Sequence, residues 1–358
     1  MAILLSASEC SSKKTFPMYR SPSVVAEFSV TKERDVVPGR MEARYFYNKV
    51  LEHGAKCHFD LNEGFETFQS KDELLNGGEK LNVLCKWLIT RASPNASLKE
   101  VCCDADFVCY RGLLTRVAST PYDVSESWML SAVRIESTIF LCEFPTEQKK
   151  HRIETMTQRE KMMCYWGFKF EQFVTTDTPT SSPVTNEAVC NLREFDVVLK
   201  TTLGDEDRVR LLFSAETDCF DSHGRYLELK TQANGLTGSF WMNKAMKWWI
   251  QSFLAGIEQI VVGFRNNSGI VERVSHMKVA ELYRHAVRWT PAVTFSFLLD
   301  TLRLVKQKMF EVDSLIYVLF EYAPSERAVT FRNVPEGEDY AQFLFLPDEF
   351  LEHFGARR

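Results

Sequence analysis

The sequence predicts a mixed α/β fold of the α+β kind, in which helices flank a central mixed β-sheet within a single large domain. Short apolar runs rich in β-branched and aromatic residues recur along the chain and end at turn residues, as is typical of strands. Segments with helical signals alternate with these runs. Hydrophobic residues make up 45% of the 358 residues and charged residues 25%, which is enough apolar material for a buried core.

We divide the chain into an irregular N-terminal arm, residues 1–40, and one domain over residues 41–358. The arm is polar, contains Pro and Ser, and is weakly periodic. A Pro-, Ser- and Thr-rich segment at about 175–190 predicts a surface loop. The strand-like segments after this loop look central to a sheet, so we favour an insertion within one domain over a linker between two.

The expected elements follow from periodicity and from turn signals. The expected helices are 79–92, 157–167, 239–254 and 295–309. The expected strands are 195–201, 209–219, 226–231, 259–265, 270–274, 314–322 and 328–333, and the segments 104–120 and 128–144 also indicate sheet. The second helix begins with a capping box, Thr157 and Glu160, and Gly167 predicts its end, so that Glu171 would follow the helix.

The charge balance and the apolar pattern exclude several classes of protein. With 43 Lys and Arg against 48 Asp and Glu, the net charge is −5, which excludes a broadly basic protein that coats nucleic acid. The start of the chain lacks the apolar region of a secretory signal, and charged residues interrupt every apolar run before it could span a membrane. We therefore expect a soluble intracellular protein whose ten cysteines are free thiols.

The residues with the strongest chemical signal lie in two successive strand-like segments. Glu216 and Asp218 are two residues apart in the first segment, so on one strand both carboxylates leave the same face. Glu228 and Lys230 repeat this spacing in the second. The intervening five-residue turn would let the two strands pair. Pairing would bring three acids and one lysine together.

A cluster of carboxylates is costly to bury unless cations neutralise it, and hard divalent cations prefer oxygen ligands. The cluster therefore predicts Mg²⁺ or Mn²⁺. A lysine beside it would stabilise charge on a transferring phosphoryl group. Asp, nine residues, Glu, one residue and Lys is also the core spacing of PD-(D/E)xK nucleases. The alternative is a solvated outer face of an amphipathic hairpin, but neither face of 211–219 has the pattern of a solvent face.

Five segments in order make the chain similar to a known family. They are FVCYRGLLTRV (107–117), WGFKFE (166–171), LLFSAETDC (211–219), YLELKT (226–231) and KWWIQSFLAGIEQIVVGFR (247–265). Together they resemble the motifs of the decapping and exoribonuclease (DXO) family. The resemblance implies a PD-(D/E)xK nuclease-like fold that acts on RNA 5′ ends. Members of that family remove incomplete caps, 5′ triphosphates or NAD caps, and many then degrade the RNA 5′ to 3′.

The resemblance also implies roles for individual residues. Two divalent ions, Mg²⁺ or Mn²⁺, would be bound by Glu171, Asp218, Glu228, the Leu229 carbonyl and, through water, Glu216, with Lys230 at the scissile phosphate, Gln251 at the 5′-terminal phosphate and Arg111 on a substrate phosphate. Without the family motifs, Arg111 would be interpreted as a surface or ion-pair residue in a loop, and Gln251 as a solvent-facing helix residue. Ala215 stands where the family commonly has glycine, and this difference removes no ligand.

The expected function is therefore metal-dependent hydrolysis of RNA 5′ ends by residues 41–358, with decapping and 5′ to 3′ degradation in RNA quality control. The expected partner is RNA with a 5′ phosphate, an incomplete cap or an NAD cap, bound by a monomer. The alternative is a non-catalytic RNA 5′-end binder or partner of another exonuclease, and a third hypothesis is a DNA nuclease. The resemblance favours the nucleus and leaves the cytoplasm open.

Overall fold

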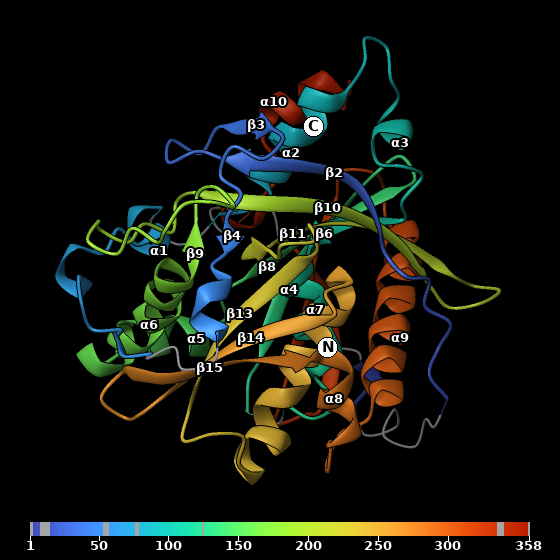
Figure 1. Ribbon diagram of the computed structural model, residues 1–358. Helices are drawn as coiled ribbons and strands as arrows, with labels where there is room; N and C mark the ends of the chain where they lie inside the picture. The colour runs from blue at the N-terminus through green and yellow to red at the C-terminus, as the bar shows by residue number, and fades with distance from the viewer. Residues whose placement is uncertain are drawn as a thin grey trace.

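The computed structural model describes residues 3–7, 15–52, 57–75, 79–123, 125–334 and 340–356. Two β-sheets organise these residues (Figure 1). The large sheet has ten strands in the order β1-β17-β16-β7-β8-β6-β11-β10-β2-β3. The small sheet has seven strands in the order β5-β15-β14-β13-β12-β4-β9.

The bounds of the elements are as follows. The strands of the large sheet are β1 (Ile3–Ser6), β2 (Ser23–Val30), β3 (Val36–Pro38), β6 (Phe107–Tyr110), β7 (Trp128–Ile135), β8 (Thr138–Phe144), β10 (Glu194–Leu203), β11 (Val209–Glu216), β16 (Tyr317–Ala323) and β17 (Ala328–Asn333). Those of the small sheet are β4 (Tyr45–Phe46), β5 (Phe59–Asp60), β9 (Thr175–Thr176), β12 (Cys219–Phe220), β13 (Tyr226–Ala233), β14 (Gln259–Arg265) and β15 (Ile270–Lys278). The α-helices are α1 (Lys71–Leu74), α2 (Asn82–Arg91), α3 (Leu98–Val101), α4 (Arg111–Ser119), α5 (Glu147–Glu154), α6 (Gln158–Val174), α7 (Ala245–Ala255), α8 (Val279–Arg284), α9 (Pro291–Phe310) and α10 (Asp348–His353), and a π-helical turn, Phe240–Lys244, precedes α7.

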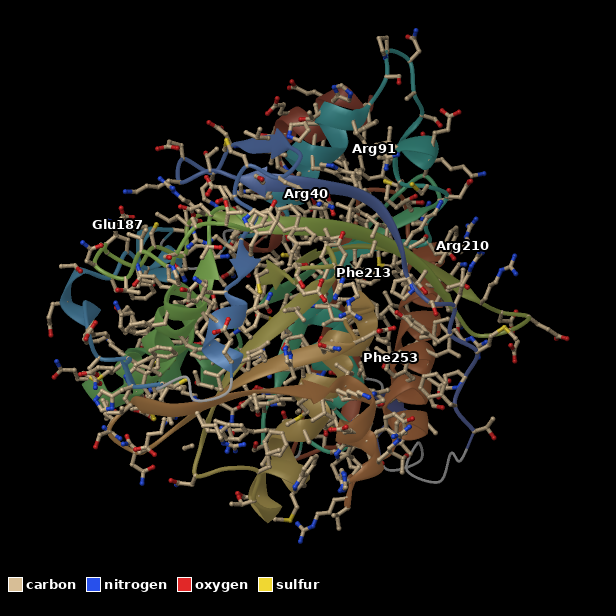
Figure 2. The ribbon with its side chains drawn as sticks, in the orientation of Figure 1. Arg40, Arg91, Glu187, Arg210, Phe213 and Phe253 are labelled. Carbon is tan, nitrogen blue, oxygen red and sulfur yellow. The ribbon has the colours of Figure 1, made fainter. Side chains whose placement is uncertain are left out.

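Alternation of apolar residues along the strands assigns the helices to the faces of the sheets. In β11, Phe213 joins a core cluster with α4, α7 and α9, whereas Leu212 joins a second cluster with α2 and α10. In β14, Val262 belongs to the first cluster and Val261 to a third, which contains α6. The first cluster thus connects one face of each sheet through α4, α7 and α9, with Phe213 near the centre of the molecule (Figure 2).

The prediction of an irregular arm over residues 1–40 is wrong for the described part of that segment. β1 pairs with β17, and β2 pairs with β10, so both strands extend the large sheet. Phe28 and Val30 are fully buried, whereas the first half of β2 is largely exposed and carries Ser23. A strand near a sheet edge that is buried over only half its length gives a weak period in sequence. The division into domains stays a prediction.

Two further predictions fail where packing overrides the local signal. Helix α6 continues past Gly167 to Val174. Phe170 and Val174 are buried against the small sheet, and the free energy gained by burying them exceeds the cost of about 1 kcal/mol for a glycine within a helix. Glu171 therefore lies in the last turn of α6. Within 104–120, only β6 is a strand, and Arg111 begins helix α4.

The remaining expected elements agree with the structure to within a few residues. Helices α2, α7 and α9 and strands β7, β8, β10 and β13 to β17 all form where the periodicity predicts them. Between β9 and β10, residues 177–193 contain neither helix nor strand and are mostly exposed, as expected of a surface loop. In the part of the chain that the structure describes, no helix has both the length and the apolar composition to cross a membrane.

Candidate active site

The chain changes sheets between the first two acids of the predicted cluster. β11 ends at Glu216 in the large sheet, and β12 begins at Cys219 in the small sheet. The prediction that Glu216 and Asp218 share one strand is therefore wrong, and only the short β12 pairs with β13. β11 pairs with β10 and β6 instead. Both carboxylates nevertheless line the same pocket.

Strand β13 directs its charged residues toward one side and its leucines toward the other. Leu227 and Leu229 are buried in the cluster that contains α6. Because successive side chains on a strand point to opposite faces, Glu228 and Lys230 point toward α4 and α7. The alternation in the sequence YLELKT thus places an acid and a lysine on the inner face of the small sheet.

Glu228 is the acceptor at which three other predicted residues meet. Arg111, at the start of α4, donates from Nη1 to Oε2 at 3.3 Å. Gln251 of α7 donates from Nε2 to Oε1 at 2.8 Å. Lys230 forms an ion pair with the same Oε1. The structure therefore brings together two side chains that, without the family motifs, would be interpreted as a loop residue and a solvent-facing residue.

Helix α6 contributes the fourth acid. Its N-terminus is fixed by the predicted capping box of Thr157 and Glu160. Near its other end, Glu171 lines a pocket of about 420 Å³ together with Glu216 and Asp218. Three cationic side chains lie in the lining of the same pocket, Lys32, Arg44 and Arg193. We call Glu171, Glu216, Asp218 and Glu228 the acid cluster.

The electrostatics separate three members of the acid cluster from the fourth. Burial, followed by repulsion from Asp218, raises the pKa of Glu171 well above its usual value. Burial and Glu228 raise the pKa of Asp218 to about 7. Desolvation by the surrounding protein, followed by repulsion from Glu194, raises the pKa of Glu216 to about 7. The positive charge around these three carboxyls is therefore too small to stabilise their ionised forms.

Glu228 has the opposite balance. Its burial acts to raise its pKa, but Lys230 and Arg111 outweigh that effect, so the pKa lies below its usual value. Burial in turn acts to lower the pKa of Lys230, and Glu228 and Asp218 outweigh it, so that pKa is raised. Both groups of this pair are therefore charged at neutral pH.

The donor chemistry of the acid cluster fits a hard divalent cation. Four carboxylates supply only oxygen ligands, which Mg²⁺ and Mn²⁺ prefer, and the raised pKa values of three of them indicate uncompensated negative charge. Among the described residues, no group of three or more His, Cys, Asp and Glu side chains is already arranged to hold a metal. Instead, Asp218 Oδ2 accepts a hydrogen bond from the Leu229 N–H at 2.6 Å. Metal ligation by the Leu229 carbonyl stays a prediction.

A second charged group beside Glu216 was missed by sequence reasoning. Lys71 forms an ion pair with Glu194. Asp196 stands opposite Glu216 in the β10–β11 register and accepts a hydrogen bond from Ser214 Oγ at 3.0 Å. Burial, followed by Glu194, raises the pKa of Asp196 to about 7. The available signal was an acid at Asp196, next to the apolar residues of the strand segment FDVVLK.

The cationic residues of the pocket were missed for a different reason. Lys32 and Arg44 lie in the N-terminal part of the chain, and Arg193 lies at the end of the loop before β10. None belongs to a motif, so only the fold brings these residues to the acid cluster.

A mixed sheet that carries clustered carboxylates, with a lysine two residues after one of them, defines a protein of the PD-(D/E)xK nuclease class. The chain belongs to the RAI1-like PD-(D/E)XK nuclease family, because the model of that family matches residues 20–351. This membership confirms the mixed α/β fold and the resemblance that five sequence segments indicated.

Relatives and solved structures agree with this assignment. The chain is 36% identical to the decapping nuclease dom-3 of Caenorhabditis elegans, over 92% of this chain and 84% of that protein. It is 31% identical to the human decapping and exoribonuclease protein, over 94% and 86%. Rai1 of Scheffersomyces stipitis, solved with (3′-NADP)⁺ and calcium, has a TM-score of 0.79 at 21% identity and full coverage of both chains. Candida albicans Rai1 with pU5 and Mn²⁺ has a TM-score of 0.77 at 20% identity, covering 97% and 98%.

Proposed function

We propose that this protein is a metal-dependent hydrolase of RNA 5′ ends. It removes incomplete caps, 5′ triphosphates or NAD caps, and it degrades the exposed RNA 5′ to 3′. The observation that carries the proposal is the meeting of Arg111, Lys230 and Gln251 at Glu228, beside the pocket that the other three acids line. The relatives named as decapping nucleases support the choice of RNA 5′ ends as substrate.

The roles of the residues follow from their chemistry. Glu171, Glu216, Asp218 and Glu228 would hold one or two divalent ions, which when bound neutralise charge on the phosphate and make water a better nucleophile. Lys230 places its ammonium beside the scissile phosphate, where positive charge stabilises the transition state. Arg111 offers a planar fork that suits a phosphate.

Gln251 completes the site as a neutral donor. Its amide holds Glu228 in place when the site is empty of substrate and can turn to the 5′-terminal phosphate, as its position in the family motif suggests. A neutral side chain here orients the phosphate without adding a positive charge beside the ions.

We also propose that the protein acts as a monomer and that it resides in the nucleus, as the family resemblance of its motifs favours. We further propose an exonuclease as its protein partner. Gel filtration of the purified protein tests the monomer directly.

The experiment is product analysis with four RNA substrates that differ only at the 5′ end: monophosphate, triphosphate, unmethylated cap and NAD cap. Each is incubated with Mn²⁺, with Mg²⁺ and with EDTA. We expect release of end groups or nucleotides only when Mn²⁺ or Mg²⁺ is present. The relative rates of release then rank the four substrates. If RNA is bound but no product forms with either metal, the protein is a non-catalytic 5′-end binder. A matched DNA substrate separates the DNA nuclease hypothesis, since 2′-OH contacts favour RNA.

A further inference from the structure

The loop between β9 and β10 forms one wall of the pocket beside the acid cluster. Val184, Glu187 and Ala188 line this pocket, and all three are exposed. Residues 182–188, which we call the pocket wall, contain neither helix nor strand. Among the described residues, hydrogen bonds join the pocket wall to the rest of the chain at only two carbonyls, those of Thr185 and Glu187. The position of the wall therefore depends on the donors to these carbonyls.

Two side chains of helix α6 supply these donors. Lys169 Nζ donates to the Thr185 carbonyl at 2.8 Å and to Gln172 Oε1 at 2.9 Å. Gln172 Nε2 donates in turn to the Glu187 carbonyl at 3.0 Å. The two side chains are neighbours on the helix surface because they are three residues apart. Lys169 thus holds one carbonyl directly and orients the amide that holds the other.

Lys169 is a buried charge with no close carboxylate among the described residues. Its side chain is only 2% exposed, and its ion pair with Glu63 spans 4.0 Å to a side chain that is 58% exposed. Its Nζ also lies 4.9 Å from the ring centroid of Phe173. Burying an ammonium costs free energy that a distant, solvated carboxylate does not recover. Lys169 therefore contributes less to the stability of the fold than to the position of the oxygens it contacts.

The same helix carries a candidate metal ligand. Glu171 lies between Lys169 and Gln172 in the chain, and α6 contributes Phe168, Glu171 and Gln172 to the lining of the pocket. One rigid element therefore fixes the pocket wall relative to the acid cluster. A substrate that meets a wall already in place loses no binding free energy to ordering it.

We propose that Lys169 is a positioning residue, which acts through Gln172 to fix residues 182–188 as a wall of the substrate pocket. This inference rests on the proposed function, because it takes the pocket beside the acid cluster to receive the 5′ end of the RNA. It concerns the affinity for that substrate: a fixed wall lowers the KM, whereas the acid cluster sets kcat.

The first test is limited digestion with a protease that cuts after glutamate. Glu187 is exposed in the pocket wall (Figure 2), and cleavage between Glu187 and Ala188 requires the wall to leave α6. In Lys169→Met, whose new side chain is unbranched and uncharged, we expect this bond to be cleaved about tenfold faster. Gln172→Met should change the rate in the same direction. Mass spectrometry of the fragments identifies the bond.

The second test is turnover of a 5′-triphosphorylated RNA. For both variants we expect a several-fold higher KM, a kcat within about a factor of two of the wild type, and the same Mn²⁺ concentration at half-maximal rate. The matched control is Lys161→Met, which makes the same chemical change at an exposed position of α6. We expect this variant to behave as the wild type in both tests. Thermal unfolding verifies that each variant is folded.

Two outcomes would overturn the inference. Cleavage after Glu187 at the wild-type rate in both variants would mean that Lys169 and Gln172 do not hold the wall. An unchanged KM with a lower kcat or a higher requirement for Mn²⁺ would mean that Lys169 only positions Glu171. Fluorescence anisotropy of the same RNA in EDTA measures its Kd without turnover. A wild type that binds this RNA and never cleaves it would therefore refute the proposed function, while the digestion and the Kd still test the wall.

Discussion

Glu228 is only 1% exposed and accepts hydrogen bonds from Arg111, Lys230 and Gln251. A buried carboxylate with this many cationic donors stays ionised. The other members of the acid cluster lack such partners, and the raised pKa values of the half-buried Glu171 and Asp218 mean that ionising these two carboxyls costs folding free energy. At the scale of the residue, repulsion among these carboxylates therefore destabilises the folded protein until a divalent cation neutralises their charge.

The replacement Glu171→Gln tests this charge strain. A carboxyl whose folded pKa is raised above the unfolded value destabilises the fold at every pH above the unfolded pKa, so at neutral pH the neutral amide should raise the melting temperature in EDTA. Mn²⁺ should stabilise the wild type by about 2.7 kcal/mol at a hundredfold excess over its Kd. The same Mn²⁺ should stabilise the variant less. Thermal unfolding with and without Mn²⁺ measures both effects.

The control for this prediction is Glu187→Gln. Glu187 lines the same pocket but lies exposed in the loop between β9 and β10 (Figure 2). Its replacement should alter neither the melting temperature in EDTA nor the response to Mn²⁺. Equal stabilisation of the wild type and Glu171→Gln by Mn²⁺ would contradict the assignment of Glu171 as a ligand.

At the scale of the element, the position of helix α6 depends on a close approach to β14. A Cβ atom at Gly263 would lie 2.5 Å from Cε2 of Phe170, which is closer than such atoms come in proteins. Only glycine lets the helix lie against the strand at this point. Because Glu171 follows Phe170, the same contact sets the position of the metal-ligand candidate.

Gly263→Ala should therefore push α6 away from the small sheet. We expect a loss of about 1–3 kcal/mol in the free energy of unfolding, as for other overpacked cores, and a lower kcat with metal. Urea unfolding and turnover measurements report the two effects. In contrast, Gly167→Ala in α6 meets no atom within 4 Å and should stabilise the helix by up to about 1 kcal/mol. A Gly263→Ala protein with the stability and kcat of the wild type would refute this account of the contact.

The elements also show which parts of the fold the sequence can predict. The alternation in YLELKT was sufficient to place Glu228 and Lys230 on one face, because successive side chains of any strand point to opposite faces of its sheet. The end of α6 was not predictable, since the burial of Phe170 and Val174 depends on a sheet formed by distant residues. The change of sheets after Glu216 was not predicted, because Glu216, Thr217 and Asp218 were interpreted as the polar positions of one continuous strand.

At the scale of the whole molecule, the chain order of the strands differs from their order in the sheets. β6 pairs with β11 in parallel, although about 100 residues separate them, and β1 pairs with β17 near the other end of the chain. Such pairings depend on global packing and are invisible to local periodicity. At the active site, the family motifs supplied the information that local periodicity lacks, since they predicted that Arg111 and Gln251 lie near the acids.

Asp106, which directly precedes β6, connects that strand to β11 and to helix α9. Its Oδ1 contacts Arg210 Nη2 of β11 and Lys306 Nζ of α9, both at 2.9 Å, and its Oδ2 accepts from the Arg210 N–H at 2.8 Å. Burial acts to raise the pKa of Asp106, but Arg210 and Lys306 outweigh it and lower the pKa. The carboxylate therefore stabilises the fold where it is ionised.

Asp106→Asn should lower the free energy of unfolding at neutral pH by about 1–3 kcal/mol, the cost of losing charged hydrogen bonds. A carboxyl with a lowered folded pKa contributes stability above its unfolded pKa and loses it as the pH falls through the folded value. The difference between wild type and variant should thus shrink in acid. Urea unfolding over a pH series measures it. Asp104→Asn, whose ion pair with Lys99 is exposed, should have little effect at any pH. A difference that persists unchanged in acid would contradict the role of the charge.

The most direct test of the central claim is the rate of product release from a 5′-triphosphorylated or NAD-capped RNA in Mn²⁺, measured for the wild type and for the Asp218→Ala, Glu228→Ala double variant. The account predicts that the double variant folds, as shown by its circular dichroism, and that its rate falls by at least about a hundredfold. A folded double variant with the full rate of the wild type would contradict the claim that the acid cluster is the catalytic centre.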